Sequence, residues 1–159
     1  MRLTRVVTLA TLLTVLASPA FADGTVFIGG TGSPSTRQAK GFAVGMGLLI
    51  VAFEFEYSNT SEDITEGAPR LRTGMGNVLL QTPVAIAGFQ PYFTIGGGGY
   101  RENLDTRQET NFGLNTGGGV KINLVGPLRL RADYRAFTLK GSPLYDVVHR
   151  VYVGANLKF

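Results

Sequence analysis

The feature that most constrains this chain is an alternation of apolar and polar residues. In residues 50–58, the apolar side of the alternation is formed by Val51, Phe53, Phe55 and Tyr57. Glu54 and Glu56 lie on the opposite side, and the same alternation runs through residues 110–124, 128–138 and 147–159. A period of two is that of a β-strand whose two faces meet different surroundings. The pattern therefore predicts an all-β protein.

Four weaker strands are expected at residues 25–30, 38–47, 69–81 and 91–101, where glycines blur the alternation, so that the expected total is eight. The polar connections are residues 31–37, 59–68, 102–109 and 140–145, and short turns are expected around 47–49 and 125–127. Residues 82–90 form a longer, rather apolar connection. In an up-and-down meander, all the polar loops fall at one end and the turns at the other, as in outer-membrane barrels. We therefore expect an eight-stranded antiparallel up-and-down transmembrane β-barrel.

Alternation alone does not say which face of the barrel meets lipid, because a soluble lipocalin-like barrel also alternates. The charges on the polar faces have both signs, with Glu54 and Glu56 expected near the level of Arg131 and Arg135. A narrow interior accommodates such groups by pairing them. The apolar faces are about as long as a tilted strand that crosses a membrane. Aromatic residues near the strand ends are expected to form two interfacial girdles: Tyr57, Phe89, Tyr134, Phe137, Tyr145 and Phe159.

Residues 1–22 have the organisation of a cleaved secretory signal peptide. Arg2 and Arg5 precede an apolar run from Val6 to Leu16, and the residues Ala-Phe-Ala at 20–22 supply a cleavage site. The apolar run is too short to cross a bilayer as a helix. We expect one mature domain, the barrel, at residues 23–159.

Charge and cysteine content exclude some functions. Without Arg2 and Arg5, 13 basic residues remain against 11 acidic ones, with no block of like charges, so nucleic acid is not an expected partner. The chain contains no cysteine and one histidine, which argues against a disulfide framework and a metal site. No cofactor is expected.

Several motifs together resemble a known family. They are PYF at 91–93, GGGGY at 96–100, GGGVK at 117–121, LRADYR at 130–135 and HRVYVGANLKF at 149–159. In this order, they resemble the outer-membrane protein β-barrel superfamily, the small eight-stranded barrels of the OmpA, OmpX and opacity-protein types. The resemblance covers the whole mature chain. It implies a location in the cell outer membrane and contact with outer-membrane lipid.

The C-terminal segment resembles the signal by which this family engages its barrel-assembly machinery. The apolar residues at every second position are Val151, Val153, Ala155, Leu157 and Phe159. A strand with an open hydrogen-bonding edge and one apolar face is suited to strand addition. The parity of this strand also places Arg150 and Lys158 inside the barrel.

Catalysis has two candidate sites in the sequence. Some members of the superfamily modify lipid A, and His149 is expected on the lipid side near the loop end, but no serine is in register with it. Glu54 and Glu56 could act as a glycosidase pair, but a closed barrel of this size leaves no substrate cleft. We therefore expect no enzymatic activity.

The remaining functions are a structural or surface-interaction role and a narrow pore. Porins with aqueous channels need about 16 strands, so an eight-stranded interior filled by side chains would conduct poorly. The interior charge network expected to stabilise the barrel consists of Glu54, Glu56, Arg129, Arg131 and Arg135. We expect a monomeric, non-enzymatic protein, with a narrow pore as the alternative and a lipid A-modifying enzyme as a more remote one.

Overall fold

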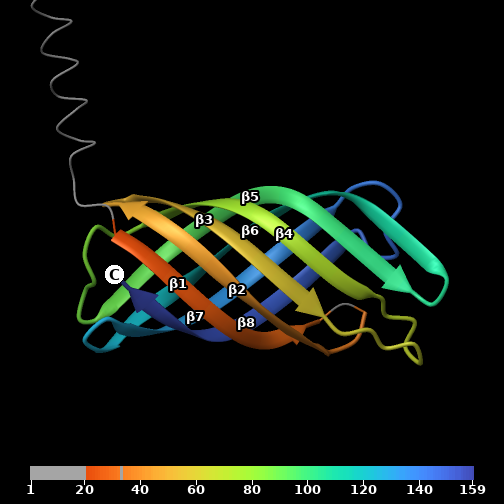
Figure 1. The fold of residues 1–159 in the computed structure, drawn as a ribbon, viewed down its shortest axis with the longest axis horizontal. Helices are drawn as coiled ribbons and strands as arrows, with labels where there is room; N and C mark the ends of the chain where they lie inside the picture. Colours follow the sequence, from red (N-terminus) through yellow and green to blue (C-terminus); the bar gives the residue numbers. More distant parts are fainter. Residues whose placement is uncertain (1–20, 33) are drawn as a thin grey trace, which may run out of the picture.

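The computed structural model describes residues 21–32 and 34–159, and these form one closed barrel of eight antiparallel strands (Figure 1). Each strand pairs with its neighbours in the sequence, and β1 pairs with β8 to close the sheet. The eight-stranded up-and-down barrel predicted from the alternation is confirmed. The expected signal peptide lies outside the described residues except for Phe21 and Ala22, which begin the first strand.

The strands are β1 (Phe21–Thr31), β2 (Arg37–Leu48), β3 (Val51–Thr60), β4 (Arg70–Gln81), β5 (Phe89–Leu104), β6 (Arg107–Val125), β7 (Leu128–Leu139) and β8 (Val147–Lys158). The four strongly alternating segments correspond to β3, β6, β7 and β8. The glycine-rich segments correspond to the other four. No helix in the described part of the chain is long and apolar enough to cross a membrane.

One expected loop is instead a hairpin. The prediction of a polar loop at residues 102–109 was wrong, because β5 and β6 remain paired until Leu104 lies opposite Arg107. Glu102 points into the barrel and accepts a hydrogen bond from the backbone of Leu144, so polarity at this position does not end the strand. Asp105 makes the tight turn with a φ of 51°, a left-handed conformation that Asp tolerates better than most residues.

The two ends of the barrel differ in their connections. Figure 1 shows the β1–β2, β3–β4, β5–β6 and β7–β8 connections at one end, which we call the loop end. The other three connections lie at the opposite end, together with Phe159 and the start of β1, and we call this the turn end. The predicted separation of polar loops from turns is thus present.

The two faces of the sheet follow the predicted parity. The outward-facing residues form an apolar band that includes Val26, Ile28, Phe42, Val44, Met46, Phe53, Phe55, Phe93, Ile95, Phe112, Leu114, Val151 and Val153. Phe137 and Tyr145, however, do not join an outer aromatic girdle. Phe137 is 0% exposed because it shares the parity of Arg135 on β7 and therefore points inward. Tyr145 packs against the same interior cluster as Phe137.

Candidate functional site

The centre of the barrel is occupied by charged side chains that compensate one another. In the described part of the chain, this central network contains three arginines and three carboxylates: Glu54, Glu56, Arg131, Asp133, Arg135 and Arg150. All six are buried. Burial of an unpaired charge is costly, so such a cluster is stable only when each group has a partner of opposite charge.

Arg131 bridges two carboxylates in this network. Its guanidinium binds both carboxylate oxygens of Glu54, with Nη2 lying 3.2 Å from Oε1. Nη2 and Nε also donate to Asp133 Oδ2 at 2.8 Å and 3.0 Å. A planar guanidinium can satisfy several acceptors at fixed angles, which a lysine ammonium cannot do in the same way. Arg131 therefore joins two carboxylates on different strands.

The ion pairs made by Glu54 and Glu56 cross the lumen. Glu54 and Glu56 lie on β3, whereas Arg131 and Arg135 lie on β7, and these two strands are diametrically opposite in the closed sheet. Arg135 Nη2 lies 3.0 Å from Glu54 Oε1 and 3.4 Å from Glu56 Oε2. Arg150 on β8 pairs with Glu56 Oε1 at 3.3 Å. The network therefore connects opposite walls of the barrel through its interior.

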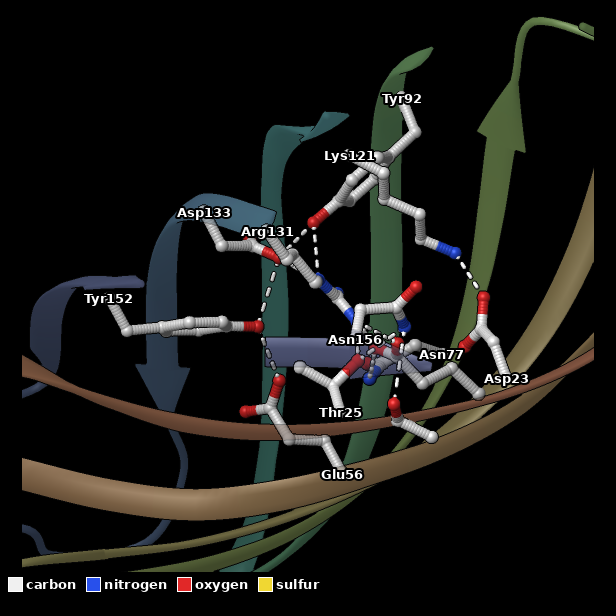
Figure 2. A network of polar contacts seen from close by, with 12 residues as sticks. Asp23, Thr25, Glu56, Asn77, Tyr92, Lys121, Arg131, Asp133, Tyr152 and Asn156 are labelled. Carbon is white, nitrogen blue, oxygen red and sulfur yellow. Dashed lines mark hydrogen bonds and ion pairs between the residues drawn. The ribbon is translucent and has the colours of Figure 1, made fainter. Parts of the chain in front are cut away.

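Two tyrosines complete the network. In Figure 2, the hydroxyl groups of Tyr92 and Tyr152 both point at Asp133. The Tyr152 hydroxyl also lies 2.9 Å from Glu56 Oε2, and the Tyr92 hydroxyl accepts a 2.7 Å hydrogen bond from Arg131 Nε. Neither tyrosine was expected in the network. The alternation of β8 is consistent with an inward Tyr152, but its partners depend on distances across the barrel.

Arg129 belongs to a second ion-pair group nearer the turn end. It does not contact Glu54 or Glu56 but pairs with Asp23 at 3.1 Å and donates to Asn156 at 2.7 Å. Lys121 pairs with the same Asp23 oxygen, as Figure 2 also shows. A small polar pocket of about 40 Å³ opens beside these residues, with room for roughly three water molecules.

An apolar cluster lies on the β4 to β8 side of the interior, between the central network and the loop end. It consists of Leu71, Met75, Tyr100, Phe137, Leu139 and Val148, with Tyr145 packed against it. The Arg150 guanidinium lies 4.3 Å from the centre of the Phe137 ring, so the charged and apolar parts of the interior are in direct contact. This cluster was not predicted, because Phe137 and Tyr145 were expected at the membrane interface.

His149 lies on the outer surface, as its parity predicts. Its Nδ1 lies 2.8 Å from the hydroxyl of Tyr134, and the two rings are stacked. In the described part of the chain, no three His, Cys, Asp or Glu side chains converge as metal ligands would. Among the described residues, the side chain that hydrogen-bonds to His149 belongs to a tyrosine, not to a serine or a carboxylate.

The C-terminal strand closes the barrel against β1. Val151, Val153 and Leu157 point outward, while Tyr152 and Asn156 point inward. Phe159 follows the last strand and is 73% exposed. Its backbone exchanges two hydrogen bonds with Ala22, at 2.9 Å and 3.0 Å. Lys158 lies near the turn end, with its ammonium 3.8 Å from the centre of the Phe21 ring.

No protein-family model and no curated protein sequence matches the chain. Solved structures do match. Neisserial surface protein A is 14% identical, with a TM-score of 0.70 over 88% of this chain and 97% of that one.

The N-terminal β-barrel domain of OprF from Pseudomonas aeruginosa is 16% identical, with a TM-score of 0.66 over 87% of this chain and 97% of that one. The outer-membrane enzyme PagL is 10% identical, with a TM-score of 0.55 over 85% of this chain and 98% of that one. At these identities, the likeness concerns the fold, and one fold carries several functions. Together with the closed eight-stranded barrel, the comparisons show that this chain has the fold of the small eight-stranded outer-membrane β-barrel proteins.

Proposed function

We propose that this protein is an integral outer-membrane barrel with a structural or surface-interaction role, exported by a cleaved signal peptide at residues 1–22. The outward apolar band supports membrane insertion, because a closed barrel leaves no unpaired strand edge in lipid. Outer-membrane lipid is then its surrounding partner. We further propose that it acts as a monomer and that Val151, Val153, Ala155, Leu157 and Phe159 form its assembly signal.

The observation that carries this proposal is the filled interior. The central network spans the lumen between β3 and β7, and the apolar cluster fills part of the interior toward the loop end. An ion moving through the barrel would have to displace these paired charges, which is costly inside a protein. A sealed barrel of this kind contributes its outer surface and its loops, rather than a channel, to the membrane.

A narrow pore is the alternative function, and conductance separates the two. Purified protein reconstituted into planar bilayers is expected to give no stepwise conductance above the baseline of protein-free bilayers. A porin with about 16 strands, measured in the same bilayers, provides the control for detection. Reproducible unitary conductance steps from the pure protein would contradict the proposal and favour the pore.

Catalysis by the outer surface is the more remote alternative, since PagL is an enzyme with this fold. The candidate base is His149, and its neighbour is the Tyr134 hydroxyl at 2.8 Å. A nucleophilic mechanism needs a serine or similar group within hydrogen-bond reach of the base, and that base is usually oriented by a third group. The recorded contacts of His149 favour an interfacial aromatic pair, so we propose a non-enzymatic protein.

A further inference from the structure

The charged residues on the outer face of the barrel are distributed unevenly. In the described strands, the lysines and arginines that point outward are Lys40, Arg70, Arg72 and Arg101, and no carboxylate points outward. All four cations lie near the loop end of β2, β4 and β5. Arg70 is paired with Glu62 in the adjacent loop at 3.3 Å. The other three have no ion-pair partner among the described residues.

The sheet register places these three cations in one row. Lys40 is paired with Asn59, Asn59 with Arg72, and Arg72 with Arg101. The two arginines are therefore directly opposite each other on neighbouring strands, where Cβ atoms are separated by about 5 Å. Like charges in such a position repel each other and destabilise the sheet unless an anion lies between them.

Next to the two arginines, toward the middle of the barrel, the outer surface is formed by glycines and lacks side chains. The next outward positions on β4 and β5, toward the middle of the barrel, are Gly74, Gly76, Gly97 and Gly99. The Phe112 ring leans over Gly97, where an added Cβ would lie 2.8 Å from the ring. The remaining three are open, because an added Cβ would meet nothing within 4 Å at Gly99 and nothing closer than 3.8 Å at Gly76.

The inward-facing glycines of β5, in contrast, are required by packing. An added Cβ would lie 2.1 Å from the Asn77 side chain at Gly96 and 2.0 Å from the backbone of Gly74 at Gly98. Packing within the barrel thus excludes any side chain at Gly96 and Gly98. Packing does not exclude a side chain at Gly76 or Gly99. The packing of the barrel therefore does not explain why these outward positions next to the arginines are glycines.

This glycine surface continues into an apolar depression. This depression has a volume of about 540 Å³, and the outward residues lining it include Val44, Phe55, Gly76, Val78 and Ile95. Gly76 is four residues from Arg72, which places it about 10 Å deeper along the barrel axis. This depth lies within one leaflet of a bilayer whose hydrocarbon core is about 30 Å thick.

We propose that this face of β2 to β5 binds an anionic lipid of the membrane leaflet at the loop end. The lipid phosphate lies between Arg72 and Arg101 with Lys40 nearby, and an acyl chain follows the open glycines into the apolar depression. Arginine suits this role because its guanidinium binds phosphate oxygens in a bidentate manner. The inference rests on the proposed membrane insertion, since the row would otherwise lie in water.

The test uses the full mature chain folded in a neutral detergent and mixed with equal amounts of phosphatidylglycerol and phosphatidylcholine. Native mass spectrometry then measures the fraction of barrels that retains each lipid. The wild-type protein is expected to retain phosphatidylglycerol about tenfold better than phosphatidylcholine, because two cations lie near the phosphate of the anionic lipid. The variant Arg72→Glu/Arg101→Glu is expected to lose this preference.

Two controls separate the site from other effects. The variant Arg107→Glu/Lys140→Glu changes the charge equally at the loop end but lies outside the row, and it should keep the preference. Gly99→Leu adds a side chain to the glycine surface without changing charge and should lower the retention of phosphatidylglycerol several-fold. Ala132→Leu, an added leucine at an outward position of β7, should not.

Three results would overturn the proposal. They are equal retention of both lipids by the wild type, loss of preference in both charge-reversed variants, and displacement of the lipid by inorganic phosphate at the same concentration. The last would indicate a site for free phosphate instead of a lipid. Heat-dependent gel mobility of each variant, measured in parallel, reports whether the barrel is folded. A folded barrel without lipid preference therefore refutes this inference and leaves the proposed function standing.

Discussion

Replacing Arg131 by methionine is expected to lower the free energy of unfolding of the barrel in detergent by about 3–5 kcal/mol. Arg131 is 0% exposed and pairs with both Glu54 and Asp133. Methionine preserves much of the side-chain volume but leaves three carboxylates against two arginines in the central network. Glu54 and Asp133 then share Arg135, and one buried negative charge is uncompensated. Urea titration followed by heat-dependent gel mobility measures the loss.

Two further variants identify the cause of this loss. Lys140→Met removes an exposed cation at the loop end and should change the free energy of unfolding by less than about 0.5 kcal/mol. The double variant Arg131→Met/Glu54→Gln should be more stable than Arg131→Met alone, because it restores equal numbers of arginines and carboxylates in the central network. Additive losses in the double variant would contradict the assignment of Glu54 as the partner of Arg131.

Replacing Phe159 by alanine is expected to reduce the amount of assembled barrel in a Gram-negative host several-fold. The same variant should refold in detergent as well as the wild type. The Phe159 side chain is largely exposed, so its removal costs little packing in the folded barrel. Its proposed role is recognition during strand addition by the assembly machinery, which in vitro refolding does not require.

The matched control for this experiment is Phe89→Ala. Phe89 is also an exposed aromatic residue near the turn end, with 51% of its surface accessible, but it lies at the start of β5. It is expected to have a much smaller effect on assembly in cells. Equal assembly of the two variants, or an equal defect in detergent refolding, would show that Phe159 is not a specific signal.

The sequence predicted the fold well because a period of two determines which side chains share a face, and the barrel closes consecutive strands in order. The parity of β3 and β7 alone placed Glu54, Glu56, Arg131 and Arg135 inside the same barrel. The same alternation predicts that Phe137 points inward, because it shares the face of Arg135. Phe137 was nevertheless expected in the aromatic girdle, because it is an aromatic residue near a strand end.

The partners within the interior could not be predicted from parity. Strands in a barrel are tilted and staggered, so residues with equivalent sequence positions can lie at different heights. Arg129 is only two residues from Arg131, yet it pairs with Asp23 at the turn end. Tyr92 lies in a strand whose alternation is blurred by Gly96 to Gly99, and its contact with Asp133 depends on the three-dimensional stagger of β5 and β7.

The central claim is that the chain forms a closed membrane barrel held together by its interior. Electrophoresis of the purified mature protein in detergent, with and without boiling, tests this claim most directly. A closed barrel with a paired interior should remain folded without boiling and migrate differently from the boiled, unfolded chain. Identical mobility of the two samples, from protein that has been refolded in detergent, would contradict it.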